Sequence, residues 1–145
     1  MFVPVDFERQ VLRERLRDAG FREDQPAFFS WLGVTMYLTR DAMLSTLRFV
    51  AGCAPGGGIT FDYMLPPSRL PWLRRLGFWL VARRVARAGE PWTTWFDPDD
   101  MAHELTAMGF TRLDELDGPA LDRCYFGGRE KRVGGASLGR VMTAR

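Results

Sequence analysis

Residues 26–34 are nearly continuously apolar, and this run constrains the fold more than any other feature of the chain. A short apolar run between turn residues is typical of a strand buried on both faces of a parallel sheet. A helical pattern with Thr39 as its expected N-cap follows, and residues 59–65 then form a second apolar run. A strand, a helix and a strand in this order predict a right-handed crossover in a mostly parallel sheet, with residues 26–34 as a central strand.

The rest of the chain continues this alternation. Residues 1–5 look like the end of a buried strand, and Asp6 is the expected cap of a following helix, as Asp97 is of a later one. Three more elements are expected: a strand at 110–116, a short helix at 120–126 and a last strand at 138–144. Because no long helix precedes the last strand, it should run antiparallel to its neighbour. The pattern predicts one α/β domain over residues 1–145, with a mostly parallel sheet and an antiparallel last strand.

The composition excludes several classes of function. A net charge of +2 over 145 residues lacks the concentrated basic excess of a nucleic-acid-binding protein. His103 is the only histidine, so a two-histidine zinc site cannot form and no metal site is expected. Cys53 and Cys124 lie far apart, which argues against a disulfide framework and favours a reducing, cytoplasmic compartment.

The most unusual stretch is residues 69–87, a helical pattern with two tryptophans, six arginines and no acidic residue. The arginines interrupt its apolar run, so no membrane span is expected. A basic helix with tryptophans is typical of a helix that binds a membrane surface. The alternative, which we favour, is that residues 68–88 form a cap whose apolar face covers a pocket.

Ligands of open α/β sheets bind outside the carboxyl ends of the strands, so residues that directly follow the predicted strands are the candidates for a site. Asp6 follows the first strand, and one interpretation is that it only caps a helix. The alternative is that its carboxylate accepts a hydrogen bond from the amine of a bound adenine while the N–H of Phe7 donates to a ring nitrogen. Gly33 permits close approach of a ligand, and Tyr37 is either a packed side chain or one that orients a substrate. Asp62 lies at the end of the third strand.

Two other motifs do not indicate a site. The three glycines at 56–58 precede a strand rather than a helix, so they lack the helix N-terminus that binds phosphate and are expected to form a turn. His103 and Glu104 resemble the start of a zinc-protease motif, but the second histidine would fall on Ala107, so Asp99 and His103 are expected to be a surface pair.

Several blocks of sequence together resemble one family, the leucine-carboxyl-methyltransferase-like group of class I S-adenosylmethionine-dependent methyltransferases. The resemblance covers essentially the whole chain. It rests on residues 3–7, 26–39, 59–63, 89–93, 96–98, 107–110, 125–126 and 139–145.

The resemblance implies a Rossmann-like methyltransferase sheet, of which this chain would be the C-terminal half, and S-adenosyl-L-methionine as the cofactor. The implied reaction is methyl transfer to an oxygen, carboxyl or hydroxyl, of a small-molecule substrate. The resemblance implies these site residues: Asp6, Phe7, Leu32 and Gly33 at the cofactor, and Tyr37 on the substrate side. Asp62 and Tyr63, at the end of the third strand, are further candidates for the substrate side. A hydroxyl acceptor would require a base, for which Asp62 is the nearest candidate, whereas a carboxylate acceptor would not.

The sequence departs from the family pattern in two ways. Many relatives have a glutamate at the position of Leu32, and leucine cannot make the charge-assisted hydrogen bond. The glycine-rich turn and the acidic ribose ligand of the family's N-terminal half also have no counterpart, so weak cofactor binding or none is expected.

Three hypotheses follow for the isolated chain. It is an enzyme, alone or beside a separate N-terminal half. Alternatively, it is a non-catalytic remnant that pairs an exposed strand edge with a partner or a second copy. The third hypothesis is a peripheral membrane protein that binds through residues 69–87.

Overall fold

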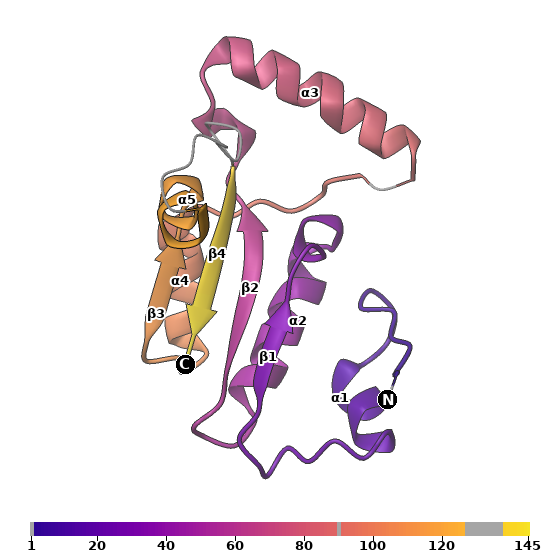
Figure 1. Cartoon of the computed structure of the whole chain (residues 1–145). Coiled ribbons are helices and arrows are strands. Elements are labelled where there is room, and N and C mark those ends of the chain that lie inside the picture. Colours follow the sequence, from indigo (N-terminus) through magenta and orange to yellow (C-terminus); the bar gives the residue numbers. More distant parts are fainter. Residues whose placement is uncertain (1, 90, 127–137) are drawn as a thin grey trace.

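The computed structural model describes residues 2–89, 91–126 and 138–145 (Figure 1). Its elements in chain order are α1 (Leu12–Asp18), β1 (Phe28–Trp31), the 3-10 helix η1 (Thr35–Tyr37), α2 (Arg40–Ala51), β2 (Gly58–Met64), the 3-10 helix η2 (Pro67–Arg69), α3 (Trp72–Arg87), α4 (Pro98–Ala107), β3 (Leu113–Leu116), α5 (Gly118–Phe126) and β4 (Gly139–Ala144).

The four strands form one sheet in the order β1-β2-β4-β3. β1 pairs with β2 in parallel, whereas β4 is antiparallel to both β2 and β3. β1, β2 and β3 therefore point in one direction and β4 in the other, which confirms the expected antiparallel last strand. The prediction of a mostly parallel sheet is correct for strand direction but not for pairing. Because β4 is inserted between β2 and β3, only one of the described pairings is parallel.

The expected first strand is wrong. Residues 2–6 form no strand, and Val11 rather than Asp6 precedes α1. Val3 and Val5 instead line an apolar groove against α1 and β1. Packed in this way, residues 2–6 form no backbone hydrogen-bond ladder with the sheet. The Asp6 carboxylate closes a local turn instead, because it accepts a hydrogen bond from the N–H of Glu8 at 3.0 Å.

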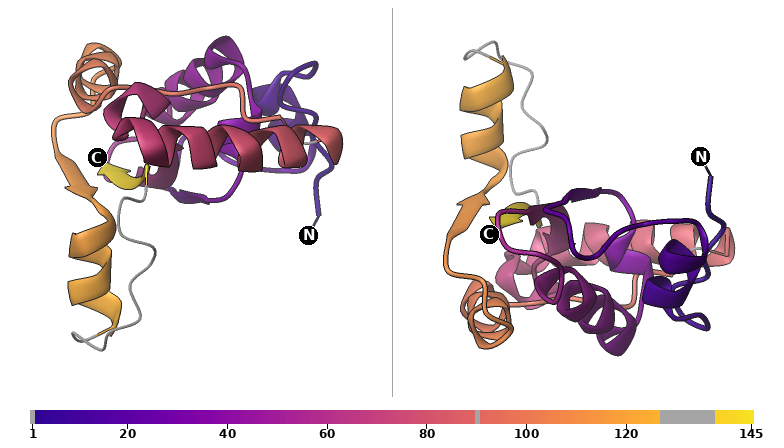
Figure 2. Two further views of the ribbon diagram at one scale, coloured as in Figure 1. Left: turned by 90° about the horizontal axis from the view of Figure 1, so that it is seen from above. Right: turned by 90° about the horizontal axis from the view of Figure 1, so that it is seen from below.

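β1 is shorter than expected and lies at the edge of the described sheet, not at its centre. Its side chains alternate in exposure, since Phe28 and Ser30 are exposed and Trp31 is buried. The reason is visible in Figures 1 and 2, where α1, α2 and α4 all lie on the same side of the sheet. One face of β1 is therefore covered and the other is open.

The core lies between the sheet and helices α2 and α4. Thr39 caps α2 as expected, because its Oγ1 accepts from the N–H of Ala42 at 3.3 Å. The apolar side chains that α2, β2 and α4 bury together are Met43, Leu44, Leu47, Val50, Ile59, Phe61, Met101 and Leu105. This core fixes the direction of β2 and hence the position of the residues at its end.

The later elements also agree with expectation. α4 starts at Pro98 after Asp97, α5 covers the expected short helix, and β4 matches the expected last strand. α3 confirms the helical pattern of residues 69–87 and lies across one end of the molecule, apart from the sheet (Figure 1). None of the helices in the described parts of the chain is both long and apolar enough to cross a membrane.

Candidate functional site

The carboxyl ends of β1 and β2 are joined by a hydrogen bond between two of the predicted site residues. The backbone N–H of Gly33 donates to Asp62 Oδ1 at 2.9 Å. Gly33 has φ +74°, a conformation that glycine adopts at little cost, and an added Cβ would have no atom within 4 Å. Gly33 thus turns the chain sharply after β1 and leaves its backbone open to a ligand.

The 3-10 helix η1 is fixed to the end of β2 by Thr35. The hydroxyl of Thr35, which is buried, donates to the backbone oxygen of Asp62 at 2.5 Å. Tyr37 closes this helix, and its N–H donates to the Val34 oxygen at 3.1 Å. The Tyr37 side chain is 37% exposed, so it is not a fully packed core tyrosine. Gly33, Tyr37 and Asp62 are therefore held by one local network.

Residues 92–96, which we call the threonine strap, connect the two strand ends after α3. The N–H and the hydroxyl of Thr93 donate to the backbone oxygens of Met36 and Leu38, both at 2.8 Å, and the Thr94 hydroxyl also donates to Leu38. At the other end of the strap, the N–H of Phe96 donates to the Met64 oxygen at 3.0 Å. The strap thus holds η1 against the end of β2.

Sequence reasoning gave no role to these threonines, although residues 89–93 were part of the family resemblance. A threonine that bonds a backbone oxygen more than fifty positions away leaves no periodic or local signal in the sequence. Only the pair of adjacent hydroxyls directly after the α3 segment could have drawn attention to them.

The segment around Asp6 and Phe7 lies at the same end of β1. The ring of Phe7 contacts Trp31, with 5.4 Å between ring centroids. The carboxylate of Glu8 accepts from the N–H and the hydroxyl of Thr39, at 2.6 and 2.9 Å. Asp6 is exposed. These contacts join the predicted adenine-binding segment to the start of α2, directly after η1.

The two remaining predicted residues lie at this end of the sheet in different surroundings. Leu32 directly follows β1 and is 54% exposed, a high value for a leucine. Tyr63 is fully buried, and its hydroxyl donates to Glu115 on β3. Because successive strand residues point to opposite faces, Tyr63 points away from the face that carries Asp62.

Burial raises the pKa of Asp62, and the hydrogen bond from the Gly33 N–H opposes this by stabilising the charged form. A raised pKa makes Asp62 a better proton acceptor than an ordinary aspartate. Burial also raises the pKa of Tyr63, with a further contribution from its hydrogen bond to Glu115, so that hydroxyl stays protonated.

We expect Asp62→Asn to change the free energy of unfolding in a pH-dependent way. In the folded chain the Asp62 pKa is raised, so ionisation of Asp62 lowers the free energy of unfolding at pH values above that pKa. This loss of stability disappears as the pH falls below the ordinary pKa of an aspartate. The amide oxygen of the new asparagine can still accept from Gly33, so the variant should be more stable than the parent near neutral pH and equal to it near about pH 3. Denaturant unfolding at several pH values measures this.

Asp62→Ala is the matched control, because it removes the charge and the acceptor together. It leaves the Gly33 N–H without its partner and should lose about 1 kcal/mol relative to Asp62→Asn at every pH. An advantage of Asp62→Asn that grows towards acid pH would contradict the expected direction.

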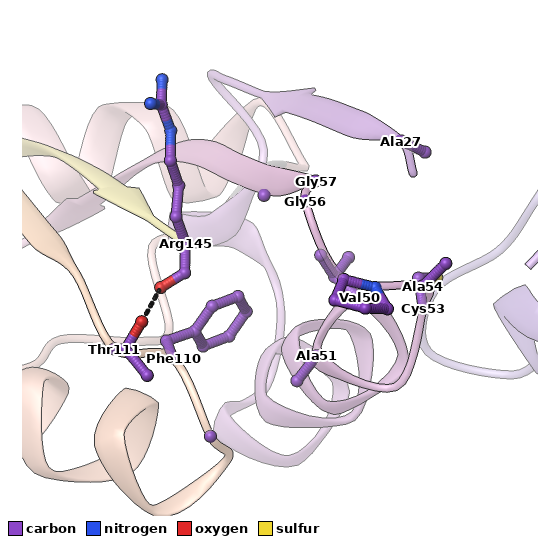
Figure 3. A pocket seen from close by; sticks show the side chains of 13 residues that line it. Ala27, Val50, Ala51, Cys53, Ala54, Gly56, Gly57, Phe110, Thr111 and Arg145 are labelled. Atoms are coloured by element: carbon purple, nitrogen blue, oxygen red, sulfur yellow. Dashed lines mark hydrogen bonds between the residues drawn. The ribbon is translucent and has the colours of Figure 1, made fainter. Parts of the chain in front are cut away.

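A cavity of about 430 Å³ lies at the opposite end of the sheet (Figure 3). Its walls are the turn that precedes β2, the loop at 109–111 and Arg145, whose backbone oxygen accepts from Thr111. This is the end at which β1 and β2 begin, whereas ligands of such sheets bind where the strands end. We therefore do not assign the site to this cavity. An apolar groove of about 300 Å³ lies beside Phe7 and Trp31.

No group of three or more potential metal ligands comes together within residues 2–89, 91–126 and 138–145. The site consists instead of backbone N–H groups, one carboxylate and one exposed tyrosine at the ends of neighbouring strands. These strand directions, the inserted antiparallel last strand and the helices between the strands form a Rossmann-like α/β arrangement.

Comparison with known proteins confirms the family resemblance. The family model for leucine carboxyl methyltransferase matches residues 1–51. YktD of Bacillus subtilis, a proposed S-adenosyl-L-methionine-dependent methyltransferase, is 28% identical over 133 residues, which are 91% of this chain and 43% of YktD. The chain thus spans less than half the length of the relative that it matches.

Two solved structures have a similar fold. A possible exported protein from Bordetella parapertussis has a TM-score of 0.54 at 20% identity, over 86% of this chain and 39% of that protein. A DUF574 family protein from Streptomyces avermitilis has a TM-score of 0.52 at 16% identity, over 90% of this chain and 48% of that protein.

Proposed function

We propose that this chain is the substrate-side half of an S-adenosyl-L-methionine-dependent O-methyltransferase. The observation that carries the proposal is the hydrogen bond from Gly33 to Asp62, which brings the ends of two neighbouring parallel strands together beside Tyr37. In open α/β sheets this is the place where ligands bind. The similarity to YktD supports the proposed class of reaction.

The residues at this end fit part of a cofactor site. The N–H of Phe7 bonds to no described residue and Asp6 is exposed, so the two can meet the edge of an adenine as donor and acceptor. The open backbone at Gly33 permits close contact, whereas Leu32 offers only an apolar side chain. Since these residues provide few charge-assisted bonds, we expect weak binding.

When bound, S-adenosyl-L-methionine supplies a methyl group already activated by a sulfonium. The chain's own residues then contribute positioning and exclusion of water. The bound cofactor would supply this methyl group to the acceptor oxygen, and its sulfur would leave with the electron pair of the carbon–sulfur bond. For a hydroxyl acceptor, Asp62 Oδ2, which has no partner among the described residues, takes the proton. A carboxylate acceptor has no proton to lose, and Tyr37 orients it.

Isothermal titration calorimetry of the chain with S-adenosyl-L-methionine tests the proposal. We expect a dissociation constant in the millimolar range, because few of the bonds that hold the cofactor are present. Asp6→Ala should weaken binding further, while Asp18→Ala, which removes an aspartate at the end of α1, should not. Absence of heat at millimolar cofactor would remove the catalytic claim for this chain alone.

The exposed edge of β1 supports a second part of the proposal. No described strand pairs with the outer edge of β1, and an unpaired edge can accept a strand from another chain. We propose that this edge pairs with the N-terminal half of a methyltransferase sheet or, in a non-catalytic remnant, with a second copy. Light scattering that gives only a monomer, with or without a candidate partner, would contradict the pairing.

The free thiols of Cys53 and Cys124 fit a reducing, cytoplasmic compartment.

A further inference from the structure

Helix α3 has two unlike sides. Its inner side, with Gly77, Phe78 and Val81, borders a groove of about 290 Å³ above the end of β2, and Phe78 contacts Trp92 with 5.3 Å between ring centroids. An ion pair from Arg69 to Asp97, at 2.5 Å, fixes the chain just before the helix. The inner side is thus attached to the body of the molecule, as expected for a cap.

The outer side of α3 is an exposed apolar stripe. Trp72, Leu76, Trp79 and Leu80 follow the i, i+4, i+7, i+8 spacing that places side chains on one face of a helix. Their exposed fractions are 68%, 58%, 45% and 63%, so a large part of each side chain is open to solvent. The stripe is long enough for a specific contact and contains two tryptophans, whose rings favour the boundary between water and an apolar phase.

The charge of the helix indicates what the stripe contacts. The same face continues into Arg83 and Arg87, with Arg84 beside them, and no acidic residue occurs anywhere in α3. A second copy of this helix would bring like charges together, which disfavours a dimer through α3. The arginines match a negatively charged surface, and the tryptophans match an apolar layer just below it. Anionic lipid headgroups over acyl chains provide both.

The position of α3 makes such a contact possible. The helix forms one extremity of the molecule, and no described element lies beyond it (Figure 1). Seen from above, α3 is accessible along its whole length (Figure 2). A flat surface can therefore reach the stripe without meeting the sheet.

We propose that the outer face of α3 is a binding site for an anionic lipid bilayer surface, on which the helix lies in the headgroup region without spanning the membrane. The tryptophans and leucines of the stripe insert at the boundary of the acyl chains, and Arg83, Arg84 and Arg87 bind the phosphate and carboxylate groups of the lipids. This site does not depend on methyltransferase activity.

Vesicle flotation with the whole chain tests this site. We expect the chain to float with vesicles of equal parts phosphatidylcholine and phosphatidylserine, and to stay behind with phosphatidylcholine alone or at high salt. The triple variant Arg83→Gln, Arg84→Gln, Arg87→Gln should lower the partition coefficient roughly 100-fold, from about 1 kcal/mol for each arginine. The matched control Arg17→Gln, Arg48→Gln, Arg123→Gln removes the same charge elsewhere and should change the coefficient only slightly.

Tryptophan fluorescence separates docking of this face from general attraction. Bound vesicles should shift the emission to shorter wavelength, and Trp72→Phe with Trp79→Phe should abolish the shift, while circular dichroism shows that all variants fold. Equal loss in the two arginine variants would overturn the proposal. So would light scattering that shows an oligomer dispersed by Trp72→Phe with Trp79→Phe, because the stripe would then bind a second copy.

Discussion

Gly57→Ala is expected to destabilise the fold by about 3 kcal/mol, a large effect for the addition of one methyl group. An ideal Cβ on Gly57 would lie 2.0 Å from the backbone oxygen of Ala27, a distance that no real contact tolerates. The obstacle is backbone rather than a flexible side chain, so β1 and the start of β2 must move apart. That movement also breaks the bond from the Gly58 N–H to the Ala27 oxygen, at 3.0 Å.

Gly52→Ala is the matched control, five positions earlier on the same connection. Its added Cβ would meet backbone oxygens only at 3.5 Å, and its φ of −82° suits alanine. We expect a change within about 0.5 kcal/mol, or a small gain from the lower entropy of the unfolded chain. Urea unfolding followed by circular dichroism measures both variants, and equal midpoints would show that β1 and β2 are not packed as closely as described.

Local signals in the sequence predicted most of the helices. Thr39 was expected to cap α2 and does so through its hydroxyl. Asp97 was expected to start α4 and does precede it, but its carboxylate binds Arg69 instead of the first turn. The position of a helix start depends on a few neighbouring residues, whereas the partner of a capping side chain depends on what the fold brings near it.

The position of β1 could not be read in the same way. An apolar run predicts a strand, but burial on both faces requires partners that the run itself does not specify. In the structure helices cover one face only, and Phe28 on the other face is exposed. The opening apolar residues form no strand for a similar reason, because they line a groove with side chains of α1 and β1 instead of pairing with the edge of β1.

The candidate site was predicted by a rule about topology, and the structure brings some of its residues together but not all. Gly33 and Asp62 follow neighbouring parallel strands, so their contact follows from the order of the elements. Tyr63 was placed on the substrate side with Asp62 because both lie at the end of the third strand, yet alternation along a strand sends their side chains to opposite faces. The threonine strap depends on the return of the chain after α3, which no local pattern encodes.

Replacing Leu32 by glutamate is expected to strengthen binding of S-adenosyl-L-methionine at the proposed site at least tenfold. Leu32 directly follows β1 and is more than half exposed, so a longer polar side chain fits there without entering the core. A carboxylate at this position can accept a charge-assisted hydrogen bond from the cofactor, of the kind that contributes about 1.5–3 kcal/mol. Tenfold in the dissociation constant corresponds to about 1.4 kcal/mol, the lower end of that range.

The measurement is calorimetric titration of the parent and Leu32→Glu with the same cofactor. Leu73→Glu, on a leucine of α3 that is also more than half exposed, adds the same charge far from the strand ends and should leave binding unchanged. Equal cofactor affinity of Leu32→Glu and the parent would place the cofactor away from the end of β1. Added salt should reduce this affinity gain only slightly. A hydrogen bond at short range is screened by salt much less than the long-range attraction of a surface charge.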